Sequence, residues 1–320
     1  MVLGVNSNNN CESLVPEDYI CLVFFKPILN NTEFYITDNR FTGSNFTTTE
    51  GTLLVKRTGG TLAAGTVVKI GVLSNGTGTS SGWSITKAPS GANFNLNTNG
   101  DQFLIWQGTW NGANGNYTGN FLLGFNTKRI WNGGLTPASE NGNLPSVLTC
   151  HHQSFNLNEN RRYRFYDGPT NSISHGEWLV RILNNDRWKN DIPNDVNGCN
   201  LFNSSFILTN IPIQTSIPQQ EICEGELLTD LEVVDETNVV QYQWFSNNTA
   251  SNSGGTLIPG AMSHTYTPSN TTVGVTYYYC EMRINLPLNG TSNTTDCTFT
   301  SNVFEVTVHP NPITSPVTPL

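Results

Sequence analysis

Short apolar runs separated by turn residues make up most of this chain. Residues 19–25, 33–37 and 51–57 are rich in residues that favour strands, and turn-forming residues bound each run. The same pattern returns at residues 65–70, 82–85, 101–106, 121–125 and 146–149. Short strands at this spacing are typical of two packed sheets. The pattern therefore predicts an all-β N-terminal domain, folded as a β-sandwich.

One segment has a helical period instead. Within residues 174–184, Trp178 and Ile182 recur at the spacing of one helix face, and Leu179 lies close to that face. We expect one short helix here, which a β-sandwich can accommodate.

A second series of predicted strands follows a break at residues 211–220, where two prolines stand among small polar residues. These strands lie at residues 231–234, 239–245, 276–284 and 302–308. About 90 residues with strands at this spacing predict an immunoglobulin-like β-sandwich. The expected organisation is a head domain at 1–210, a linker at 211–220, an immunoglobulin-like domain at 221–310 and, at 311–320, the start of a Pro/Thr linker to further repeats.

Charge is scarce in this sequence. Of its 320 residues, 37% are hydrophobic, which is enough for packed cores, but only 12% are charged, about half of the usual ~25%. The net charge of −9 argues against nucleic-acid binding, and the apolar runs are too short for membrane helices. We therefore expect an exported, extracellular protein that neither binds nucleic acid nor inserts into a membrane.

The cysteines favour disulfide bonds over metal binding, because no Cys-x-x-Cys pair is present. In the C-terminal domain, Cys223, Trp244 and Cys280 follow the immunoglobulin order, and Tyr278 has the spacing of a tyrosine corner. Cys297 is an equally good partner for Cys223. An odd number leaves one thiol for a bond between chains, and buried unpaired cysteines are the alternative. The seven candidates are Cys11, Cys21, Cys150, Cys199, Cys223, Cys280 and Cys297.

Metal-binding patterns are weak. His151 and His152 are adjacent, so on a strand their side chains point to opposite faces. Asp38-Asn39 and the pair Asp191 and Asp195 could supply oxygen ligands for calcium, but without the spacing of a calcium loop. Turn capping is the favoured role for these side chains. We expect no cofactor, with calcium as the open alternative.

Catalytic motifs are also missing from the sequence, which contains no nucleophile elbow, zinc-protease motif or phosphate-binding loop. A glycoside hydrolase needs only two carboxylates, which can be distant in sequence, so Glu177 and Asp101 stay open as such a pair. We expect a protein that is not an enzyme.

Tryptophans among Asn and Gly offer a second possible chemistry. Exposed indole rings beside amide side chains can stack on sugars and bond to them. Trp106 and Trp110 would lie on one face if residues 106–110 are extended, and Trp131 and Trp83 have similar neighbours. Glycan contact through Trp106, Trp110 and Trp131 is one interpretation. The favoured alternative is that these rings fill the core of the sandwich.

Six stretches of the C-terminal domain match one family pattern, at residues 222–225, 242–245, 259–261, 264–268, 274–280 and 301–302. Through these stretches the domain resembles a repeat found in very large secreted proteins of Bacteroidota. The head resembles the domain that often precedes such repeats, through the stretches 3–6, 23–26, 34–39, 49–52, 62–67, 94–97, 100–103 and Trp188. Residues 62–67 and 100–103 also resemble the lamin-tail type of β-sandwich.

This resemblance implies a function that no single residue establishes. Proteins with this arrangement look like substrates of the type IX secretion system, including gliding adhesins and grappling-hook appendages. The resemblance implies a non-catalytic adhesin or filament subunit on the cell surface, which forms homo-oligomers in an appendage and contacts a target surface. A carbohydrate-binding module that recognises a surface glycan is the alternative.

Overall fold

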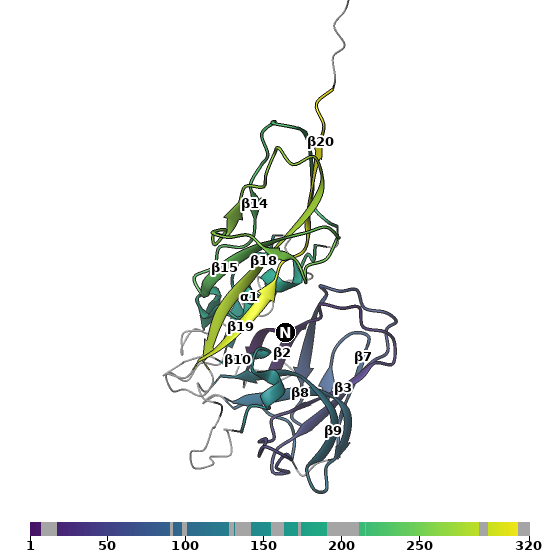
Figure 1. Cartoon of the computed structure of the whole chain (residues 1–320). Coiled ribbons are helices and arrows are strands. Elements are labelled where there is room, and N and C mark those ends of the chain that lie inside the picture. Colours follow the sequence, from purple (N-terminus) through teal and green to yellow (C-terminus); the bar gives the residue numbers. More distant parts are fainter. Residues whose placement is uncertain are drawn as a thin grey trace, which may run out of the picture. The chain divides into compact units, whose positions relative to one another are not determined.

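The computed structural model (Figure 1) consists almost entirely of strands. It describes residues 1–7, 18–89, 92–97, 101–127, 131, 142–154, 163–171, 174–190, 211–214, 216–287 and 294–312. Within these ranges there are one α-helix and two short 3-10 helices, so the predicted all-β class is confirmed. The chain divides into two compact units.

Unit 1 comprises Met1–Ser172, Ile182–Ile213 and Asn285–Cys297. The described strands of its first two segments form one sheet with the order β10-β9-β8-β3-β4-β7-β6-β5-β2-β1-β11-β12. Their bounds are β1 Val2–Asn6, β2 Asp18–Val23, β3 Glu33–Thr37, β4 Thr52–Arg57, β5 Val67–Val72, β6 Gly78–Thr79, β7 Trp83–Lys87, β8 Gln102–Asn111, β9 Asn116–Asn126, β10 His152–Ser154, β11 Tyr163–Tyr166 and β12 Trp188–Asn190.

The sheet of unit 1 folds back on itself, so that its two ends meet. The ring of Phe125 on β9 lies 6.3 Å from that of Trp188 on β12, although these strands are far apart in the sheet order. Gln153 on β10 accepts a hydrogen bond from the backbone N–H of Val2 and donates one to its carbonyl. The side-chain amide of Gln153 thus makes the same pair of hydrogen bonds to the backbone of β1 that a neighbouring strand would make. The result is two facing layers with a core between them.

The prediction of a strand at residues 146–149 in unit 1 is wrong. Residues 146–149 contain the 3-10 helix η1 (Ser146–Leu148), in which the N–H of Leu148 donates to the carbonyl of Pro145. Pro145 cannot donate to a ladder, and Leu148 is the buried residue of the turn. The second 3-10 helix, η2, spans Asn185–Arg187.

Unit 2 comprises Ile173–Arg181, Gln214–Ile284 and Thr298–Leu320. A sheet with the order β13-β20-β18-β15-β16, in which β19 also pairs with β18, accompanies a second sheet of β14 and β17. The strands are β13 Gln219–Cys223, β14 Leu231–Glu232, β15 Val239–Asn247, β16 Thr256–Leu257, β17 Thr265–Tyr266, β18 Gly274–Pro287, β19 Thr294–Thr300 and β20 Phe304–His309. The end of β18 (residues 285–287) and the start of β19 (residues 294–297) belong to unit 1.

Trp244 on β15 fills the centre of unit 2. Its side chain is fully buried, and its ring lies 5.7 Å from both Tyr266 on β17 and Phe304 on β20. The indole N–H donates to the carbonyl of Ser263. The ring therefore packs between the two sheets, as the sequence predicts for a core tryptophan. Tyr278 is also buried and packs against Tyr266.

The predicted helix is α1 (His175–Ile182). Ser174 and Glu177 form a capping box: the side chain of Ser174 accepts from the N–H of Glu177, and Glu177 accepts from the N–H of Ser174. All of α1 up to Arg181 belongs to unit 2. There Arg181 forms a buried ion pair with Glu236 at 3.1 Å. A segment from the first part of the chain thus completes the C-terminal unit.

Candidate functional site

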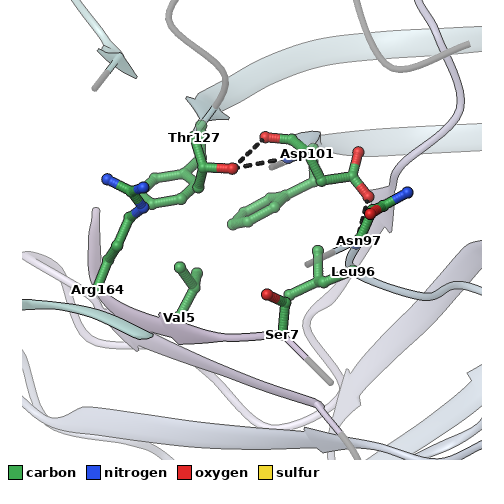
Figure 2. Close-up of a pocket in the computed structure, with 9 residues that line it drawn as sticks. Val5, Ser7, Leu96, Asn97, Asp101, Thr127 and Arg164 are labelled. Carbon is green, nitrogen blue, oxygen red and sulfur yellow. Dashed lines mark hydrogen bonds between the residues drawn. The ribbon is translucent and has the colours of Figure 1, made fainter. Parts of the chain in front are cut away.

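A small cavity opens between the two layers of unit 1 (Figure 2). Figure 2 shows Arg164 on one side of it and Asp101 with Asn97 on the other, with Val5 and Ser7 below. Its volume is about 10 Å³, which is room for roughly one water molecule. Ligand pockets are typically of about 300–1,000 Å³. The cavity is therefore a gap in the packing rather than a binding pocket for an organic ligand.

Asp101 belongs to a group of three buried aspartates that hold one segment of backbone. Asp38 accepts from the N–H of Asn95 at 2.9 Å, Asp18 from that of Leu96 at 2.8 Å, and Asp101 from that of Asn97 at 3.0 Å. We call these residues the aspartate clamp. Their carboxylates come from separate parts of the chain and bind three consecutive amides. The clamp fixes residues 95–97 against the sheet.

Burial controls the electrostatics of this clamp. The pKa of Asp38 lies well above its ordinary value, first because of burial and then because of the negative charge of Asp101. Burial also raises the pKa of Glu50 to about 7, against the opposing charge of Arg40. Oε2 of Glu50 is buried and has no hydrogen-bond partner in the described part of the chain. The negative charges of Asp101 and Glu50 therefore disfavour ionisation of Asp38.

The structure gives structural roles to the carboxylates considered for catalysis or calcium. Asp101 accepts from the N–H groups of Asn97 and Gln102. Glu177 caps α1 and accepts from the N–H of Val234 in unit 2. Asp38 accepts from the N–H of Gly51, 13 positions away, and Asn39 from that of Glu50, 11 positions away. These bonds join two separate segments and are not the local turn caps that the sequence favours. Asp191 and Asp195 lie outside the described residues.

The adjacent histidines do not share a ligand position. His152 is buried on β10, where its Nδ1 lies 3.1 Å from the carbonyl oxygen of Leu148, whereas His151 is exposed. Across the described ranges, no group of three His, Cys, Asp or Glu side chains could hold a metal ion. Among the same residues, no helix combines the length and the apolar character needed to cross a bilayer.

Only one of the candidate disulfides forms among the described cysteines. Cys150 bonds to Cys297 within unit 1, with Cα atoms 5.6 Å apart. The predicted pairing of Cys223 with Cys280 or Cys297 is wrong, since Cys297 is taken and Cys223 and Cys280 are free thiols. Cys21 is free as well. Cys11 and Cys199 lie outside the described residues.

Burial explains the state of two free thiols. Cys21 on β2 and Cys280 on β18 are buried, and burial raises the pKa of each to about 12. Both side chains therefore stay protonated and behave as small apolar residues, as in the alternative interpretation of the cysteines.

The structure divides the tryptophans considered for glycan contact into two groups. Trp106 and Trp131 are fully buried in one aromatic and aliphatic cluster. Because no face of either ring reaches solvent, neither can stack on a sugar. Trp110 is half-buried at the edge of this cluster, and its indole N–H donates to the carbonyl of Pro89 at 2.7 Å. Trp83 is buried under the guanidinium of Arg57.

The hairpin of β8 and β9 places these rings. Trp106 and Trp110 lie on the same face of β8, as predicted, with ring centroids 5.6 Å apart. The two strands pair along their whole length, from Gln102–Asn126 to Asn111–Asn116. The sequence pattern predicts only the inner part of each strand and interprets residues 107–120 as a connection. Figure 1 shows β8 and β9 as one long pair of strands.

The inner face of this hairpin closes around Phe46. The Phe46 ring stacks on Trp106 at 5.1 Å and meets Trp110 and Tyr117 edge-on at 5.7 and 5.3 Å. The N–H of Phe46 also donates to the carbonyl of Gly115 in the hairpin turn. These contacts hold the tip of the hairpin against the rest of unit 1.

A glycine pair allows the backbones of β8 and β9 to approach closely in the middle of the hairpin. Gly108 and Gly119 face each other across the hairpin, and a Cβ at Gly119 would lie 2.0 Å from the carbonyl oxygen of Gln107. Gly119 also has a φ of +109°, which other residues rarely adopt. Only glycine fits at this position.

The outer face of the hairpin carries exposed amide and hydroxyl groups in cross-strand pairs. The pairs are Gln107–Asn120, Thr109–Thr118 and Asn111–Asn116. We call these six residues the polar ladder. The hydroxyls of Thr109 and Thr118 share a hydrogen bond of 2.7 Å. No residue from 102 to 126 is Asp, Glu, Lys, Arg or His, so the ladder and its strands carry no charge.

Sequence reasoning missed the polar ladder, although a signal for it exists. Residues 106–110 and 117–121 each begin and end with an aromatic residue, have a glycine in the middle and carry a polar residue at the second and fourth positions. This period-2 placement of the polar residues predicts two strands with one polar face and, apart from the glycine, one aromatic face. The glycines and asparagines between them instead favoured a loop. The ladder is the candidate functional site of unit 1.

No protein-family model, no curated protein and no solved structure matches this chain.

Proposed function

We propose that this chain is a non-catalytic extracellular adhesion module, the N-terminal part of a longer secreted protein that mediates contact with a surface or another cell. The observation that carries the proposal is the polar ladder, which is exposed, uncharged and held in place by the aromatic cluster beneath it. A rigid face loses little conformational entropy when it binds. It can therefore use many weak hydrogen bonds for contact.

Two properties support an extracellular location. Disulfide bonds such as Cys150–Cys297 form and persist mainly in oxidising compartments. A chain with 12% charged residues also makes contacts that depend little on ionic strength. Adhesion outside a cell has to tolerate changing salt, so the composition suits this function.

Bead retention under flow tests the proposed adhesion. Beads coated with the whole chain should stay on layers of bacterial cells or on glass at shear rates that remove beads coated with serum albumin. Retention should change less than twofold between 50 and 500 mM NaCl, because the polar ladder is uncharged. Release of the coated beads at the same shear as the albumin beads, on every surface, would contradict the proposal.

Assembly and export remain further parts of the proposal. The resemblance to type IX-secreted adhesins of Bacteroidota implies that identical copies associate in an appendage. The mass of the purified chain by light scattering tests association. A multiple of the chain mass at micromolar concentration is expected, and a single-chain mass at all concentrations would contradict it.

A further inference from the structure

We propose that the polar ladder binds a neutral polysaccharide chain. This inference rests on the proposed adhesive function and names the chemistry of the partner. The ladder combines regular spacing, absence of charge and rigidity, and each of these properties restricts the partner.

The spacing of the ladder is that of a regular array. Paired residues face each other across two antiparallel strands, about 4.8 Å apart, and successive outward residues of one strand lie about 6.8 Å apart. Three consecutive rows of the hairpin thus present neutral hydrogen-bonding groups, in the pairs Gln107–Asn120, Thr109–Thr118 and Asn111–Asn116. A polymer that repeats its hydroxyl groups can contact several rows at once.

The chemistry of the ladder argues against a protein or a charged polymer as the partner. Protein interfaces depend on buried aromatic and arginine side chains, and the ladder contains neither. A charged polymer would need ionic partners, which residues 102–126 do not supply. Leu122 lies beside the ladder at an irregularity in the pairing of β8 and β9, and it is 46% exposed, which offers a small apolar surface for the C–H face of a sugar.

The strength of single contacts favours a polymer over a monosaccharide. One neutral hydrogen bond contributes only about 0.5–1.5 kcal/mol net. A single sugar that reaches one row would bind very weakly, whereas a chain that spans three rows gains from each. The hydroxyl bond between Thr109 and Thr118 and the backbone bond between Phe46 and Gly115 hold the rows in register.

Affinity electrophoresis of the whole chain tests this inference. The chain should be retarded in gels that contain hydroxyethylcellulose or dextran, and not in gels that contain the carboxylated polymer alginate. The double variant Thr118→Ala/Asn120→Ala should lose at least tenfold in affinity for the neutral polymer. Gln107→Ala/Asn111→Ala, on the other strand, should have the same effect and guards against a folding defect in the first variant.

A matched control comes from β7, where Ser84 and Thr86 are exposed at alternate positions of the strand. The double variant Ser84→Ala/Thr86→Ala should keep its affinity within twofold of the original chain. Absence of retardation in both neutral gels, equal retardation in alginate, or unchanged affinity of both ladder variants would each overturn the inference. Bead adhesion that persists in that case would leave the proposed function standing and show that its contact chemistry is different.

Discussion

Along residues 106–121, the two faces of the β8–β9 hairpin have opposite roles, although their residues alternate along the same strands. The inner face buries Trp106 and surrounds Phe46, whereas the outer face exposes the polar ladder to solvent. The side chains of the inner face are packed in the core and cannot contact a partner. The exposed side chains of the outer face can contact a partner, and they contribute little to the stability of the fold. Binding groups of a β-sheet are therefore better sought opposite the aromatic core than within it.

The largest expected effect is a difference in unfolding free energy between variants of the inner face and variants of the outer face. Trp106→Ala should lower the free energy of unfolding by about 3–5 kcal/mol, because it removes a fully buried indole from the core. Thr118→Ala/Asn120→Ala should lower it by less than about 1 kcal/mol. Urea unfolding followed by fluorescence measures both. Equal losses would mean that the outer face is part of the fold, which would break the comparison.

The glycine pair gives the next effect. Gly119→Ala should destabilise unit 1 by about 2–4 kcal/mol, because the new Cβ would lie 2.0 Å from a carbonyl oxygen at a positive φ. Gly60 is the matched control, since it has a φ of +79° but open space around its Cβ position. Gly60→Ala should cost only about 1–2 kcal/mol. Similar losses of unfolding free energy in the two variants would show that the backbone of the hairpin shifts to accommodate the new Cβ.

The smallest effect contrasts the uncharged hairpin with the region of the aspartate clamp. The pKa of Glu50 is raised from 4.5 to about 7, so its folded form binds a proton more tightly than the unfolded form. The stability from this group is complete below about pH 4.5 and is lost as pH rises through 7. Because Glu50 is only partly buried, we expect a loss of about 1 kcal/mol.

The variant Glu50→Gln isolates this contribution. It should flatten the dependence of the unfolding midpoint on pH between 5 and 8, whereas the ladder variants should leave that dependence as it is. Chemical unfolding at a series of pH values measures it. A Glu50→Gln chain with the same pH profile as the original would assign the dependence to Asp38 instead, whose pKa is raised by burial as well.

The sequence pattern correctly predicted the fold class. It failed for features that depend on contacts between residues far apart in the chain. The apolar run at 33–37 predicts β3 at its exact bounds, because a strand pattern is a local property. The pairing of Cys150 with Cys297 joins residues 147 positions apart, and nothing in the local pattern distinguishes it from other pairings. The prediction of a strand at 146–149 failed because apolar content alone does not reveal the turn after Pro145.

The candidate site also has some features set by the local sequence and others set by contacts between distant segments. Sequence alone predicted that Trp106 and Trp110 share a face if their segment is extended, that the chain is poor in charge and that one short helix lies within residues 174–184. Only the tertiary structure decided that Phe46 closes over Trp106, that residues 173–181 complete unit 2 and that the ladder faces solvent. The physical reason is that side-chain alternation is set by neighbours along the chain. Burial and pairing depend instead on which distant segments meet.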